Sequence, residues 1–111
     1  METALRASDE VLAAMIQRIT AAVQPTRIIL FGSAARGQIG PDSDLDLLVV
    51  MPDGTHRRRT ARMIYEALGG LGIAKDVVVV TEADVRDHAD NPSLVLHPAL
   101  REGREIYAAA G

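Results

Sequence analysis

Two apolar runs separated by a loop organise this sequence: IILFGS at residues 28–33 and DLDLLVV at residues 44–50. The first run is rich in branched side chains, which favour a buried strand, and it ends at Gly32 and Ser33. The second run opens with Asp44 and Asp46, which alternate with leucines, so both acids are expected on one face of a strand. Its second half is apolar throughout, which indicates a central position in the sheet.

The rest of the chain supplies helices and further strands. Thr81-Glu82-Ala83-Asp84 has the form of a capping box that opens a helix, and four valines follow Asp76 as in a buried strand. In chain order we predict helix 8–23 capped by Ser8, strand 27–31, strand 44–51, helix 55–68, strand 75–80, helix 82–88, helix 98–102 and edge strand 105–107. This order predicts an α/β (α+β) fold, a small mixed β-sheet flanked by helices, as a single domain over residues 1–111.

Helix 55–68 has two distinct faces in this interpretation. Its arginines lie mostly outside, where they suit a solvated surface or could attract RNA, a nucleotide or an acidic partner. Given the acidic total, docking to a partner is the better functional interpretation. Tyr65 and Tyr107 are expected to be packing residues, and the three histidines to be surface or capping residues. The inner face is predicted to hold Thr60, Met63, Ile64, Ala67, Leu68 and Leu71.

Composition limits the classes of function that remain. The 111 residues are 48% hydrophobic and 24% charged, which is typical of a globular domain. A net charge of -3 argues against a surface that holds long nucleic acid, because such surfaces are usually basic. The chain has no cysteine, hence no disulfide and no thiolate metal site. No signal peptide or membrane-spanning run is evident, so a cytoplasmic location is the default expectation.

Three acids are candidates for a metal site. Asp44 and Asp46 point the same way from one strand, with Cα atoms roughly 6.5 Å apart. Two such carboxylates repel each other, and a cation relieves the repulsion. Mg²⁺ fits because it binds through few carboxylates and shares phosphate oxygens, and two ions could be held together. Asp76 becomes the third acid if its strand lies beside the second strand, as a metal ligand or as an acceptor of a proton.

Gly32 and Ser33 are candidates for binding phosphate. Glycine lets the backbone approach an anion closely, and amide groups at a helix start favour negative charge. The Ser33 hydroxyl adds a donor, and Arg36 can neutralise a leaving pyrophosphate. The glycines at 32 and 37 do not form a P-loop, because Gln38-Ile39 stands where lysine and a hydroxyl residue are required.

The motifs together resemble a known family. Gly32-Ser33, ten residues, and then Asp44-Leu45-Asp46 match the G-S-x₁₀-D-x-D signature of the minimal nucleotidyltransferases in the DNA polymerase β-like superfamily. Residues 30–37, 43–49 and 76–78 agree with the finer pattern, and residues 102–107 look like the family's ending. Many relatives carry Arg or Tyr where this chain has Ala34. We expect this difference to affect binding of the substrate and not binding of the metal.

The resemblance implies a function for each of these residues. Gly32 and Ser33 would hold the nucleotide phosphates, Asp44 and Asp46 would bind magnesium, and Asp76 would complete the acid triad. The reaction would transfer a nucleoside monophosphate, expected to be AMP from ATP, to a hydroxyl with release of pyrophosphate. Many minimal members are antitoxins of a helical HEPN-type toxin (higher-eukaryote-and-prokaryote nucleotide-binding), and several attach AMP to a toxin tyrosine.

Two alternatives stay open at this stage. The chain could be a binding module that neutralises its toxin by occlusion while the active site is idle. It could also modify a small-molecule alcohol. No part of the sequence is recognised as a domain that binds such an acceptor, so a homodimer would have to form the acceptor cleft. The sequence does not decide the nucleotide base, the acceptor or the oligomeric state.

Overall fold

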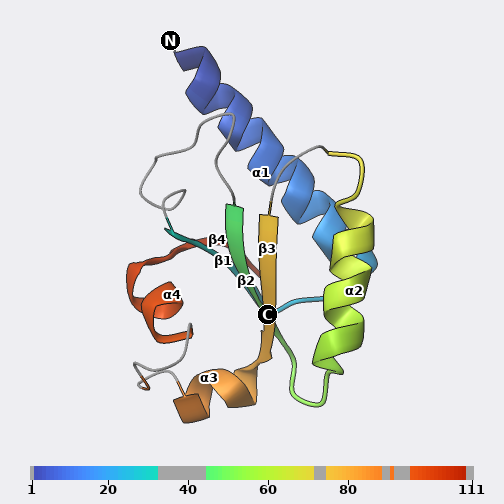
Figure 1. The fold of residues 1–111 in the computed structure, drawn as a ribbon, viewed down its shortest axis with the longest axis vertical. Helices are drawn as coiled ribbons and strands as arrows, with labels where there is room; N and C mark the ends of the chain where they lie inside the picture. Colours follow the sequence, from blue (N-terminus) through green and yellow to red (C-terminus); the bar gives the residue numbers. More distant parts are fainter. Residues whose placement is uncertain (1, 33–44, 72–74, 89–90, 92–95, 110–111) are drawn as a thin grey trace.

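The structure is a computed structural model, and it describes residues 2–32, 45–71, 75–88, 91 and 96–109. The predicted order of elements is confirmed. The elements are α1 (Glu2–Ala22), β1 (Arg27–Phe31), β2 (Leu45–Met51), α2 (Arg57–Ala67), β3 (Lys75–Thr81), α3 (Glu82–His88), α4 (Leu96–Glu102) and β4 (Arg104–Ala108) (Figure 1).

The four strands form one mixed sheet in the order β3-β2-β1-β4. β1 pairs antiparallel with both β2 and β4, and β2 pairs parallel with β3. β2 is therefore an inner strand, as its apolar second half predicts. All residues from Leu47 to Met51 are buried, as expected of a strand covered on both faces. The fold class predicted from the sequence, a small mixed sheet flanked by helices, is confirmed.

Helices cover both faces of the sheet, and each face has its own apolar cluster. On one face, Leu47 and Val49 of β2 pack with buried residues of α1 and α2, such as Met15 and Ile64. On the other face the cluster contains Ile29, Leu48, Val50 and Ala99, with Val85 of α3 packed against it. Period-two alternation along the strands produces this division. The result is a three-layer arrangement in which α1 and α2 lie on one side and α3 and α4 on the other (Figure 1).

Several element ends differ from the sequence-based prediction. α1 begins at Glu2, so Ser8 lies inside the helix and the prediction that it caps the helix is wrong. Residues 2–7 include alanine, leucine, arginine and glutamate, which are strong helix formers and extend the helix past Ser8. α4 begins at Leu96 and not at Pro98. Proline is still tolerated there because first-turn N–H groups have no intrahelical acceptor.

Side chains cap α2 and α3 where these helices follow β2 and β3. The capping box is confirmed: Asp84 N donates to Thr81 Oγ1 at 3.2 Å, and Thr81 N donates to Asp84 Oδ2 at 3.0 Å. His56 caps α2 through its Nδ1 atom, which accepts from Arg59 N at 3.1 Å. Arg57 ties the two helices together by an ion pair with Asp84 at 2.7 Å.

The inner face of α2 is narrower than predicted. Thr60 and Ile64 are buried, and so is Leu68 just after the helix, which is a stripe at a spacing of four residues. Met63 lies beside this stripe and is 38% exposed, so its assignment to the inner face is wrong. Tyr65 is 41% exposed, so the interpretation of Tyr65 as a simple packing residue is also wrong. Each helical step turns the side chain by about 100°, so Met63 and Tyr65, one residue to either side of Ile64, lie off the buried stripe and reach solvent.

Candidate functional site

Two of the predicted acids lie side by side at the start of two parallel strands. Asp46 is the second residue of β2 and Asp76 is the second residue of β3, and the two are register partners. Neighbouring strands lie about 4.8 Å apart, and register partners present their side chains on the same face. The condition under which Asp76 would join the predicted site, that its strand lies beside β2, is thus met.

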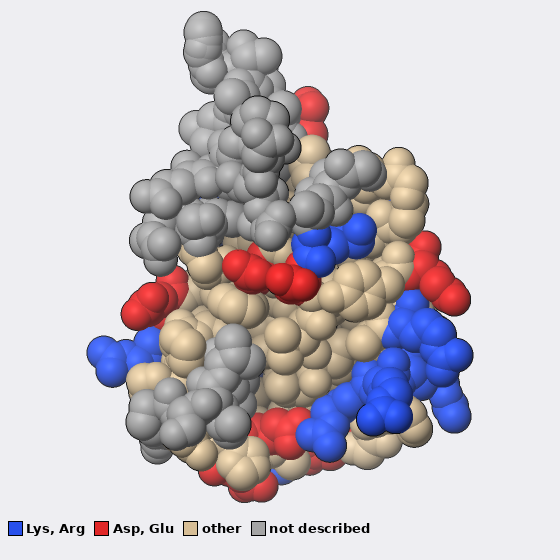
Figure 2. Space-filling model, viewed as in Figure 1, with Lys and Arg blue, Asp and Glu red and all other residues tan. Residues whose placement is uncertain are grey.

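The acid pair lies on the face that α3 and α4 cover, at the end of the sheet away from α3. Asp46 follows the same alternation as Leu48 and Val50, and these two residues belong to the cluster on that face. Asp46 is half-buried and Asp76 is exposed, so the pair is open to solvent on one side. Figure 2 shows acidic side chains at the surface over this end of β2 and β3. Two like charges at this separation repel each other and favour a bound cation.

Gly32 lies in contact with Asp46, one member of the acid pair. It follows β1 directly and has a positive φ of 78°, a conformation that glycine adopts without steric cost. A Cβ atom at this position would overlap Oδ2 of Asp46. The first residue of the predicted phosphate turn therefore lies against a predicted metal ligand, and the absence of a side chain is what makes this approach possible.

Three predicted site residues lie outside the described residues: Ser33, Arg36 and Asp44. Asp44 immediately precedes Leu45, the first residue of β2. Within the residues that the structure describes, no group of three or more His, Asp or Glu side chains could hold a metal ion. The described part of the site thus consists of Gly32, Asp46 and Asp76.

The described acids suit magnesium as a ligand set. Mg²⁺ prefers carboxylate and phosphate oxygens and is usually held by one or two carboxylates together with the phosphates of a substrate. Asp46 and Asp76 provide two carboxylates on one face, and Gly32 leaves backbone accessible beside them. Asp46 and Asp76 would hold the ion, which would supply charge neutralisation at the phosphates.

Sequence reasoning missed one polar contact close to this pair. The hydroxyl of Tyr65 on α2 accepts a hydrogen bond from Val77 N at 2.9 Å, one residue after Asp76. No local pattern in the sequence indicates this contact, because it joins a helix to the edge of a strand. The only available signal is a tyrosine outside the apolar stripe of α2.

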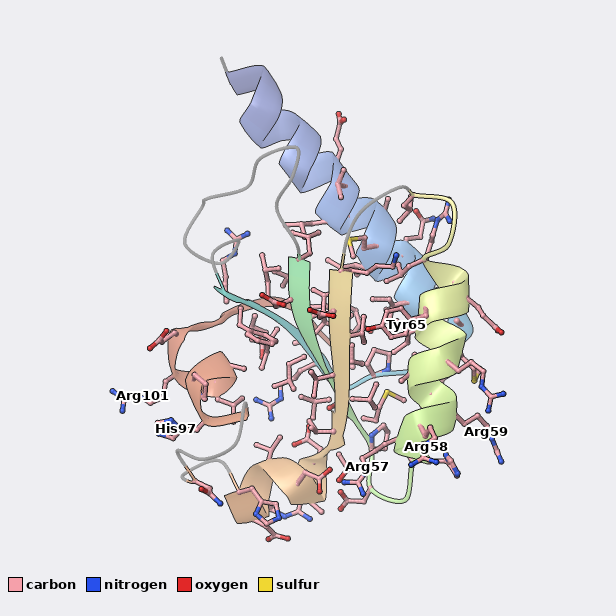
Figure 3. All side chains as sticks on the ribbon, in the orientation of Figure 1. Arg57, Arg58, Arg59, Tyr65, His97 and Arg101 are labelled. Carbon is pink, nitrogen blue, oxygen red and sulfur yellow. The ribbon has the colours of Figure 1, made fainter. Side chains whose placement is uncertain are left out.

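The exposed face of α2 carries a basic surface, which we define as Arg58, Arg59 and Arg62. All three side chains are exposed, and among the described residues none has an ion-pair partner. Arg57, in contrast, is paired with Asp84. Figure 3 shows Arg58 and Arg59 pointing away from the molecule, and Figure 2 shows basic side chains grouped over this helix.

Comparison with known proteins agrees with the fold and shows the family. A family model described as a nucleotidyltransferase domain matches residues 11–97, a span that includes Gly32, Asp46 and Asp76. The chain belongs to the nucleotidyltransferase domain family. A search among curated proteins found no match. Among the described helices, none has both the length and the apolar character needed to cross a membrane.

Two solved structures share the fold. A candidate nucleotidyltransferase from Sulfolobus solfataricus superposes with a TM-score of 0.61 at 16% identity, over 89% of this chain and 78% of that one. A toxin–antitoxin structure with AMP-PNP gives a TM-score of 0.57 at 20% identity, over 87% of this chain and 73% of that one. At these identities the likeness establishes the fold alone.

Proposed function

We propose that this chain is a Mg²⁺-dependent nucleotidyltransferase that moves AMP from ATP to a hydroxyl of a partner protein and thereby acts as an antitoxin. The observation that carries the proposal is the register pairing of Asp46 with Asp76, with the backbone of Gly32 against Asp46. The family match supports the transfer of a nucleotidyl group. The neighbour crystallised with AMP-PNP supports an adenine nucleotide as the donor.

The proposed reaction follows from the roles of the residues. Gly32 and Ser33 bind the triphosphate, and Asp44 and Asp46 hold magnesium beside it. The acceptor oxygen attacks the α-phosphorus, the bond from that phosphorus to the bridging oxygen of the β-phosphate breaks, and pyrophosphate leaves. Asp76 accepts the proton of the acceptor hydroxyl. If Asp76 instead serves as a third ligand, that proton passes to solvent water. Arg36 neutralises charge on the pyrophosphate.

A partner protein is the acceptor that best suits this architecture. All described helices and strands belong to the sheet and its two helical layers, so none in this part of the chain is left to grip an acceptor. The basic surface, with Met63 exposed beside it, provides arginine charge and a flexible apolar side chain for docking to an acidic protein. We propose a HEPN-type helical toxin as the partner and one of its tyrosines as the acceptor.

Transfer of label from ATP tests this function directly. The chain is incubated with Mg²⁺, ATP labelled at the α-phosphate and a candidate HEPN-type helical toxin. We expect label on the partner, and we expect its loss in the Asp44→Asn, Asp46→Asn double variant. Asp87→Asn is the matched control, because Asp87 is an exposed aspartate of α3. Absence of transfer, or transfer that survives the double substitution, would show that the enzymatic proposal is wrong.

The basic surface also favours a second candidate function, neutralisation of the toxin by occlusion. In that case the Asp44→Asn, Asp46→Asn variant still protects cells from the co-expressed toxin. If the variant still forms the complex but no longer protects, occlusion alone is excluded. The same pair of assays therefore separates the two candidates.

A further inference from the structure

The hydrogen bond from Val77 N to the Tyr65 hydroxyl lies on the free edge of the sheet. β3 is an outer strand, so among the described strands only β2 pairs with it. Successive N–H groups along a strand point to opposite edges, and the Val77 N–H points away from β2 towards α2. The 2.9 Å contact with the Tyr65 hydroxyl takes the place of a neighbouring strand (Figure 3).

This contact acts on the peptide unit next to Asp76. The carbonyl carbon of Asp76 and the nitrogen of Val77 belong to the same planar peptide group. A hydrogen bond that holds the Val77 N–H therefore limits rotation about ψ of Asp76. Because the Cβ atom is attached to the same Cα, the direction of the Asp76 carboxylate is restricted too.

Asp76 lies where such a restraint is needed. It is the second residue of an edge strand, it is exposed, and its register partner is another carboxylate, Asp46. Repulsion between the two acids favours fraying at the start of β3. The other end of β3 is held in the same way, since Thr81 N donates to Asp84 Oδ2 at 3.0 Å.

We propose that Tyr65 is a positioning residue that keeps the Asp76 carboxylate beside Asp46 by holding the Val77 amide. The inference rests on the proposed function, because it assigns the acid pair to a metal site. Tyr65 touches neither substrate nor metal in this role. Its effect is to preorganise a ligand on an edge strand that would otherwise be free to turn away.

The test compares Tyr65→Phe with the wild-type chain in two assays that need no activity. The first is amide hydrogen exchange by NMR, residue by residue. Loss of the hydroxyl should accelerate exchange at Val77 about tenfold, whereas Val78, whose N–H points towards β2, should change less than about twofold. The second assay titrates Mn²⁺ alone and follows the free ion by EPR. We expect affinity to fall about three- to tenfold, a change of about 0.7–1.4 kcal/mol.

Tyr107→Phe is the matched control. Tyr107 lies on β4, the opposite edge strand, and its hydroxyl has no hydrogen-bond partner among the described residues. This variant should leave Val77 exchange and Mn²⁺ affinity unchanged. In the nucleotidyl-transfer assay, Tyr65→Phe should show a higher requirement for Mg²⁺, and saturating Mg²⁺ should restore most of kcat.

Each outcome bears on the proposal in a defined way. Unchanged exchange at Val77 in Tyr65→Phe would overturn it, because the hydrogen bond would then not hold that amide. Faster exchange with unchanged Mn²⁺ affinity would overturn the positioning role and leave the proposed function intact. If the wild-type chain itself binds no Mn²⁺, the proposed metal site fails and the inference fails with it. The wild-type titration distinguishes the last two outcomes: the wild-type chain binds Mn²⁺ if only the positioning role fails, and it binds none if the metal site fails.

Discussion

The backbone of Gly32 lies directly against the carboxylate of Asp46, and a Cβ atom at residue 32 would overlap Oδ2 of that side chain. This contact brings the end of β1 close to the start of β2 at one corner of the sheet. Asp76 enters this corner from β3 as the register partner of Asp46. The candidate site therefore draws on three adjacent strands, and each of its described residues can be tested separately.

Gly32→Ala should impair both stability and activity. The new Cβ displaces Asp46, and alanine at a φ of 78° is strained by about 1–2 kcal/mol. Gly54→Ala is the matched control, since Gly54 has a φ of 88° but open space around its Cβ position. Urea unfolding should show a larger loss for Gly32→Ala, and only this variant should lose nucleotidyl transfer. Equal effects of both substitutions on transfer would contradict the role of the Gly32–Asp46 contact.

Asp76→Asn should separate activity from stability. The amide removes a negative charge next to Asp46, so the folded state should be as stable as wild type or slightly more stable at low ionic strength. Transfer should fall by about 10²–10⁴-fold, since a proton acceptor or metal ligand is lost. Thermal unfolding at two salt concentrations and initial rates of label transfer measure these effects. A variant that keeps full activity would remove Asp76 from the site.

Stability should fall in acid partly through Asp84. Hydrogen bonds, first from the Thr81 backbone and then from the Arg57 side chain, lower the pKa of Asp84 below that of an ordinary aspartate. The folded state therefore holds its proton more weakly than the unfolded state. The associated stability is present at neutral pH and is lost from about pH 5 downwards, as the pH falls through the lowered pKa.

Asp84→Ala checks this dependence. The substitution removes the hydrogen bond that Asp84 accepts in the capping box and its ion pair with Arg57. It should cost about 1 kcal/mol at pH 7, and the difference from wild type should shrink towards pH 3. Asp87→Ala serves as the control on the same helix, because Asp87 is exposed and takes no part in the capping box. The measurement is urea unfolding at pH 7, 5, 4 and 3. A constant difference over this range would contradict the assignment to Asp84.

Charge reversal on the basic surface should weaken binding of the proposed partner. Arg58→Glu with Arg59→Glu should raise the Kd by about tenfold or more at low salt, and the wild-type affinity should fall as salt rises. Arg101→Glu is the control, since Arg101 is an exposed arginine of α4 on the other side of the sheet (Figure 3). Binding is measured by calorimetry at 50 and 300 mM salt. Equal affinities of all three proteins would exclude α2 from the interface.

Gly103→Ala should lower the stability of the folded state strongly, because there is no room for a side chain at residue 103. A Cβ atom there would overlap the carbonyl oxygen of Ala99, and it would approach Ile29 Cγ2 to 2.6 Å and the carbonyl oxygen of Leu30 to 3.0 Å. Overpacking of this kind costs about 1–3 kcal/mol. Gly69→Ala is the milder comparison, because its nearest neighbour would be the Glu66 carbonyl oxygen at 3.3 Å. Similar unfolding midpoints for the two variants would contradict this account.

Much of the fold could be predicted from the sequence because its signals are local. Strand 27–31 follows from consecutive branched side chains, and helix 82–88 follows from the capping box at Thr81 and Asp84, which the structure confirms. The central place of β2 follows from its unbroken apolar half. Helix ends were less accurate, as α1 shows, because good helix formers extend a helix beyond a possible cap.

The sequence alone determined which residue types stand at the ends of the strands: glycine after β1 and acids at the start of β2 and β3. Only the tertiary structure decided that Asp76 pairs with Asp46, that Gly32 lies against Asp46, and that Tyr65 holds the edge of β3. The physical reason is range. Periodicity and capping depend on residues a few positions apart, whereas strand order, register and contacts between a helix and a sheet edge depend on packing between distant segments.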